Sequence, residues 1–137
     1  MRNGIQSFYL SLGEEACFFL QLLNIAESEV GFDIDPITAA IVCKNKDFIY
    51  FNTDNLRDKN NFLIKKHPEI LELLTGQKWQ YAKESPSYKQ KKGEYIINEY
   101  QNGTFTHFDG DNFHSLQSSQ TVKNGKIVSK RVFKVLK

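Results

Sequence analysis

Residues 14–27, EEACFFLQLLNIAE, carry apolar side chains almost all the way around a predicted helix. Gly13 precedes the segment, and the acidic pair Glu14 and Glu15 favours the positive end of a helix dipole, so the helix is predicted to begin here. A helix that is apolar on nearly every face is usually buried at the centre of its domain. The sequence therefore predicts a fold assembled around this helix.

Shorter elements are predicted on the C-terminal side of this helix. Asp35 as N-cap and Pro36 in the first turn begin a second helix, and Pro68 and Gly76 bracket a third. The intervening patterns predict two short strands and then a charged surface loop, over residues 47–51, 79–83 and 84–93. The first half of the chain is therefore expected to be mainly helical.

Two Asn-Gly pairs, Asn102-Gly103 and Asn124-Gly125, predict hairpins in the second half of the chain. Both central residues of a type I′ turn need positive φ, which Asn and Gly tolerate best. The strands expected to flank these turns cover residues 95–101 with 104–109, and residues 120–123 with 126–135. The predicted fold is α+β, with N-terminal helices and a buried central helix packed on a C-terminal antiparallel sheet.

Length and composition restrict the class of protein. A chain of 137 residues with 40% hydrophobic and 25% charged residues fits one globular domain spanning residues 1–137. No apolar run reaches the roughly 20 residues of a membrane helix, and no secretory signal is recognised, so a cytoplasmic protein without membrane partners is expected. Two cysteines, Cys17 and Cys43, are too few for a disulfide scaffold.

The net charge of +2 is unevenly distributed, because every charged residue from Lys123 onwards is Lys or Arg. Such a strand could contact phosphates, but lysines on a strand also discourage unwanted pairing between sheets. No nucleic-acid-binding motif accompanies the charge, so nucleic acid is not expected as a partner.

Cys17 is the first candidate for chemistry. It lies in the opening turn of the central helix, where unpaired N–H groups and the helix dipole favour a thiolate nucleophile. The neighbouring Glu14 and Glu15 oppose that effect. A free cysteine is also commonly a small buried hydrophobe, so a packing role is the alternative interpretation.

His107 is the second candidate, within the predicted strand sequence TFTHFD of residues 104–109. Strand alternation puts Phe105, His107 and Asp109 on one face. Cysteine–histidine catalysis combines a thiolate at a helix start with an imidazole from a distant strand, and Cys17 with His107 fits that pattern. The alternative is a packed histidine.

The N-terminal helix bearing Cys17, followed by a sheet carrying His107-Phe108, resembles the compact papain-like cysteine peptidases, which include NlpC/P60 hydrolases and bacteriocin-processing peptidases. Residues 6–13 and 17–27 are also similar to small uncharacterised bacterial and phage-borne proteins. The resemblance implies a papain-like fold and cofactor-free cleavage of an amide or peptide substrate. It implies Cys17 as nucleophile and His107 as general base.

The resemblance also implies an oxyanion-hole glutamine and a polar residue that orients the imidazole. Gln6 is the candidate glutamine, although Ser11 occupies the place where the family usually has it. Asp109 and His114 are the candidates for the orienting residue, and Asp111 follows closely. Without such an orienting contact the imidazole tautomer is not fixed, and a catalytically inactive relative is expected.

Two other functions stay open at this level. The residues His107, Asp109, Asp111 and His114 are nitrogen and oxygen ligands suited to zinc or manganese. A non-enzymatic interaction protein of phage or plasmid origin could instead bind a partner through the basic loop 89–92 or the C-terminal strand, and that hypothesis predicts a sealed Cys17. The sequence leaves the oligomeric state open.

Overall fold

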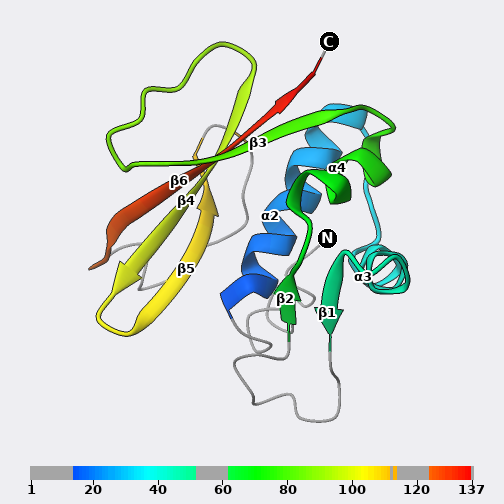
Figure 1. Ribbon diagram of the computed structural model, residues 1–137, viewed down its shortest axis with the longest axis horizontal. Helices are drawn as coiled ribbons and strands as arrows, with labels where there is room; N and C mark the ends of the chain where they lie inside the picture. Colours follow the sequence, from blue (N-terminus) through cyan, green and yellow to red (C-terminus); the bar gives the residue numbers. More distant parts are fainter. Residues whose placement is uncertain (1–13, 52–61, 112, 114–123, 137) are drawn as a thin grey trace.

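The computed structural model describes residues 14–51, 62–111, 113 and 124–136 (Figure 1). Its helices are α2 (Glu14–Val30), α3 (Pro36–Asn45) and α4 (His67–Thr75). Its strands are β1 (Ile49–Phe51), β2 (Phe62–Ile64), β3 (Trp79–Glu84), β4 (Glu94–Asn102), β5 (Phe105–Gly110) and β6 (Lys126–Val135). The predicted α+β class is confirmed. In the described ranges, no helix is long and apolar enough to span a membrane.

Two antiparallel sheets enclose α2. One contains β1 and β2, and the other has the strand order β3-β6-β4-β5. Figure 1 shows α2 between the four-stranded sheet and the smaller β1–β2 pair. The predicted central helix is therefore confirmed, and the sheet against which it packs is C-terminal in sequence.

Aromatic rings join α2 to both sheets. The Phe18 ring lies 4.6 Å from the Phe108 ring of β5, and the Phe19 ring lies 5.2 Å from the Phe62 ring of β2. Glu15 adds a polar link, because its carboxylate accepts the N–H of Ile64 at 2.9 Å. These contacts on different sides of the helix explain why its sequence is apolar almost all round.

The helix boundaries follow the predicted capping signals. Asp35 accepts the N–H of Thr38 at 3.1 Å and caps α3, with Pro36 as its first residue. Gly76 ends α4 in a left-handed conformation, with φ of 73°, and donates its N–H to Glu72 at 2.9 Å. Only glycine adopts this conformation without steric cost, which is why it stops the helix here.

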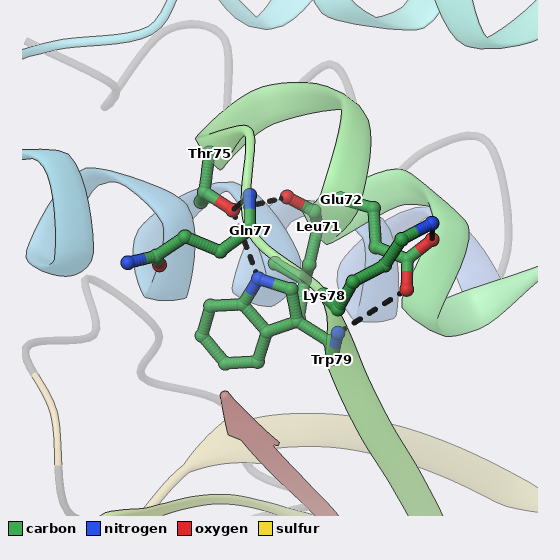
Figure 2. Close-up of polar contacts among 6 residues, drawn as sticks. All are labelled: Leu71, Glu72, Thr75, Gln77, Lys78 and Trp79. Carbon is green, nitrogen blue, oxygen red and sulfur yellow. Dashed lines mark hydrogen bonds and ion pairs between the residues drawn. The ribbon is translucent and has the colours of Figure 1, made fainter. Parts of the chain in front are cut away.

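A compact set of hydrogen bonds joins α4 to β3 (Figure 2). The Trp79 indole N–H donates to Thr75 Oγ1 at 2.9 Å, and the Trp79 backbone N–H donates to Glu72 at 3.2 Å. Thr75 Oγ1 in turn donates to the carbonyl of Leu71 at 2.7 Å. Trp79 is only 3% exposed, so its two N–H groups depend on these protein acceptors. The bonds therefore fix the point at which β3 begins.

The first predicted hairpin is confirmed, with a different turn. Asn102 pairs with Phe105, so the two loop residues are Gly103 and Thr104 rather than Asn102 and Gly103. Gly103 has φ of 62° and Thr104 has no positive φ, the pattern of a type II′ turn. Glycine at the first central position is sufficient for that turn.

The second predicted hairpin stays a prediction. Strand β6 pairs with β4 along one edge, and along the other edge it pairs with β3 over residues 130–135, so β3 does not cover residues 126–129. Residues 120–123, expected to pair with it, lie outside the described residues. The Asn-Gly signal is local, whereas β6 is placed by pairing with strands far away in sequence.

Candidate functional site

Cys17 is sealed within the core of the domain. Cys17 is only 3% exposed, and it lies on α2 beside Phe18, whose ring packs against the four-stranded sheet. Cys43 on α3 is fully buried, and burial raises the pKa of its thiol to about 11. A buried thiol lacks the solvent access that a nucleophile needs to meet a substrate.

His107 lies on the other face of the sheet. Its neighbour Phe108 points towards α2 and contacts Phe18, and successive side chains of a strand point to opposite faces. His107 therefore points away from the helix that carries Cys17, and it is also buried, at 5% exposed. The structure does not bring Cys17 and His107 together. Cysteine hydrolysis by this pair stays a prediction without support from the geometry.

The remaining predicted site residues form no catalytic group in the described ranges. Asp109 is half-buried, shares the face of His107, and accepts the N–H of Gly110 at 2.9 Å. Asp111 is exposed, and Gln6 and His114 lie outside the described residues. No group of three or more potential metal ligands is found among the residues that the structure describes.

A polar cluster that the sequence did not reveal lies between α2 and the sheet. Arg131 donates from Nε to Ser129, from Nη1 to the Tyr81 hydroxyl and from Nη2 to Glu99, each at 3.0 Å. Its guanidinium carbon lies 5.5 Å from the centre of the Phe18 ring. The side chains of Arg131 and Glu99 are only 12% and 19% exposed. These partners use all three guanidinium nitrogens, so the cluster is suited to holding the sheet on the helix.

His67 extends this cluster from the start of α4. Its ring stacks on Tyr81 with centroids 4.6 Å apart, and Phe18 lies on another side at 5.0 Å. Burial, together with repulsion from Arg131, lowers the pKa of His67 to about 4, so the imidazole is neutral at pH 7. An arginine at an inward-facing strand position was the signal that could have revealed this cluster.

A surface hollow of about 920 Å³ lies where the charged loop meets the end of β6. The loop contributes Lys92 and Gly93, and β6 contributes Lys134 and Val135, with Leu136 immediately beyond the strand. We call it the lysine hollow after Lys92 and Lys134. The two regions that the sequence offered for partner binding, the basic loop and the C-terminal strand, thus line one concave surface.

Lys134 lies close to the loop at Gly93. Gly93 has φ of 84°, and a Cβ placed on it would lie 3.9 Å from Cε of Lys134. The stem of Lys134 therefore lies close to the loop at Gly93, and Lys92 and Lys134 line the same hollow. Within the described ranges, no carboxylate lies within 4.0 Å of the ammonium group of Lys92 or Lys134.

The acidic residues of the lysine hollow are already engaged. Tyr95 donates its hydroxyl to Glu29 at 2.8 Å, and Tyr88 donates to both oxygens of Glu94 at 2.9 and 2.8 Å. The N–H of Lys91 also donates to Glu94, at 2.7 Å. Burial and the Glu29 carboxylate raise the pKa of Tyr95 to about 12, and the Glu94 hydrogen bond and burial raise that of Tyr88 to about 12. Both tyrosines therefore stay donors at pH 7, and Lys92 and Lys134 are the cationic groups that the hollow offers to a ligand.

Comparison of the chain with protein-family models, with curated proteins and with solved structures found no match.

Proposed function

We propose that the chain is a non-catalytic interaction protein that binds an acidic segment of a protein partner in the lysine hollow. The observation that carries the proposal is the pair of ammonium groups, Lys92 and Lys134, that face a concave surface without a carboxylate in ion-pair range among the described residues. Two lysines lining one hollow favour a ligand with more than one carboxylate.

The rest of the hollow fits an extended peptide better than a lone ion. Leu136 is 51% exposed at its rim, and Val135 and Tyr95 add apolar and aromatic surface to its lining. Exposed lysine–carboxylate contacts are each worth only about 0.2–1 kcal/mol. Apolar contact with Leu136 is therefore needed as well, and we expect micromolar affinity that falls as salt is added.

The seal around Cys17 favours this proposal over hydrolysis. A protein that works by surface contact has no use for an accessible thiol, and Cys17 is 3% exposed. The papain-like arrangement and the Cys17–His107 mechanism stay predictions from resemblance. Alkylation of native Cys17 at neutral pH as fast as a free thiol would favour the hydrolase over the interaction protein.

Charge reversal tests the proposal, with a short fluorescein-labelled glutamate- and leucine-containing peptide as the probe. Lys92→Glu combined with Lys134→Glu is expected to weaken peptide binding by about tenfold or more, which corresponds to ~1.4 kcal/mol. The matched control is Lys89→Glu with Lys126→Glu. It alters the same loop and the same strand and changes the net charge by the same amount, but both residues lie outside the hollow. The control is expected to change the affinity by less than about threefold.

Two results would overturn the proposal. Equal weakening by both double variants would mean that the peptide responds to the overall charge of the protein. A single-stranded DNA oligonucleotide of the same charge that bound more tightly, with the same dependence on Lys92 and Lys134, would identify a nucleic-acid site instead.

A further inference from the structure

Helix α3 presents an apolar outer face. Its buried residues are Pro36, Ala39, Ala40 and Cys43, which pack towards the core. On the other side, Ile37 is 49% exposed and Ile41 is 55% exposed. A surface helix ordinarily carries polar side chains opposite its buried stripe, so two aligned isoleucines there indicate a contact surface.

The charges at the two ends of this face have opposite signs. Residues 37, 41 and 44 follow the i, i+4, i+7 spacing of one helix face, so Lys44 continues the line of Ile37 and Ile41. Asp33 and the N-cap Asp35 lie at the opposite end, just before the helix. The face therefore runs from acidic through apolar to basic.

Such a face is complementary to itself in the antiparallel orientation. A twofold axis through its centre would place Ile37 of one copy against Ile41 of the other, and Lys44 against Asp33. The same orientation sets the positive end of each helix dipole near the negative end of the other. Lys44 has no carboxylate within 4.0 Å among the described residues, so its ammonium group can contact a second copy.

From this pattern we infer that α3 is the interface of a homodimer, formed by antiparallel packing of α3 against its copy. The helix has 10 residues and is about 15 Å long, so the contact is smaller than the roughly 800 Å² per partner of a standard interface. The dimer is therefore weak, with a dissociation constant of about 10–100 μM. It lies on a different element from the lysine hollow, so each protomer keeps its own hollow.

Sedimentation velocity on the full chain, from about 1 μM to about 1 mM, tests the dimer directly. The wild type is expected to shift from monomer to dimer across this range, whereas Ile37→Asp with Ile41→Asp stays monomeric. Because both isoleucines are exposed, this variant keeps its fold, which circular dichroism checks. The control is Phe105→Asp, which removes a 68% exposed aromatic from β5 and leaves the dimer intact.

A charge exchange tests the antiparallel orientation. Lys44→Glu and Asp33→Lys are each expected to weaken self-association at least about fivefold, because each places like charges together at both ends of the interface. An equimolar mixture of the two variants is expected to recover the wild-type dimer fraction, since both end contacts are then between opposite charges. Asp111→Lys mixed with Lys126→Glu, at exposed sites outside α3, controls for attraction between oppositely altered chains.

A wild type that stays monomeric at about 1 mM would overturn the inference. So would a dimer that survives the isoleucine changes or dissociates equally in Phe105→Asp. Failure of the charge mixture to recover the dimer would exclude the antiparallel arrangement. None of these outcomes affects peptide binding to the lysine hollow, so this inference and the proposed function can fail separately.

Discussion

Arg131 and Lys134 are two cations on one strand, β6, and they lie on opposite faces of the sheet. Arg131 faces α2, where Ser129, Tyr81 and Glu99 bind its guanidinium group. Lys134 faces outward and contacts no carboxylate within 4.0 Å in the described part of the chain. Strand alternation therefore separates a cation that holds the fold together from one that is available to a ligand.

The largest expected effect comes from removing the inner cation. Arg131→Met removes the cation that neutralises the largely buried Glu99 carboxylate and leaves it only the Ser129 hydroxyl as a donor in the cluster, so we expect the free energy of unfolding to fall by about 3 kcal/mol. Urea denaturation measures this loss. Lys134→Met, on the outer face of the same strand, is expected to stay within about 0.5 kcal/mol of the wild type. Similar losses in both variants would contradict the distinction between the two cations.

A smaller effect on stability is expected from protonation of the buried His67, which places a second positive charge near Arg131. The folded-state pKa of His67 is lowered from 6.5 to about 4, so the unfolded chain binds the proton more readily. Stability is therefore fully present above pH 6.5 and is lost as the pH falls from 6.5 towards 4. After allowance for partial exposure, the loss is on the order of 2 kcal/mol.

His67→Phe isolates this contribution, because phenylalanine preserves the stacking on Tyr81 and has no proton to gain. Urea unfolding of both proteins at several pH values between 7 and about 4 measures it as the difference between the two stability curves. We expect the wild type to lose more stability than the variant over this interval. Parallel curves would mean that His67 does not titrate in the folded state as its surroundings imply.

The smallest effects concern the tyrosines of the two sites. Tyr81→Phe removes an acceptor from the buried Arg131 and is expected to cost about 1–2 kcal/mol of unfolding free energy.

Tyr95→Phe, at the lysine hollow, is expected to cost no more than about 0.5–1 kcal/mol, because water can solvate the half-buried Glu29. Its main consequence is for binding, because the Tyr95 hydroxyl no longer offsets part of the Glu29 charge. The carboxylate then repels the acidic peptide more strongly, and peptide binding weakens about twofold to threefold. Tighter peptide binding by Tyr95→Phe would contradict this role.

Local signals in the sequence predicted much of the fold. The helices follow local signals closely, and each signal acts within a few residues. For α2 the signal is the apolar pattern of residues 14–27, for α3 it is the Asp35–Pro36 cap, and for α4 it is the terminating Gly76. Strand β2, with only three residues, was not predicted, because such a segment has too little pattern to reveal its period. The position of β6 was also not predictable, since its partners are chosen by tertiary contacts.

The candidate site was less accessible to prediction for the same physical reason. His67, Tyr81 and Arg131 belong to α4, β3 and β6, and only folding brings their side chains together. The sequence located the basic loop and the basic strand separately. It could not show that Lys92 and Lys134 line one hollow, because this depends on how the loop lies against a distant strand.

The strand order β3-β6-β4-β5 has a consequence for synthesis on the ribosome. Strand β6 is translated after the other three, yet it lies between β3 and β4, which do not pair with each other. Until it emerges from the exit tunnel, β3 has no hydrogen-bonding neighbour among the described strands, and the part of this sheet that can form is the β4–β5 hairpin. The nascent chain therefore exposes the strand edges of β3 and β4 until β6 covers them, and before then a chaperone has most to protect.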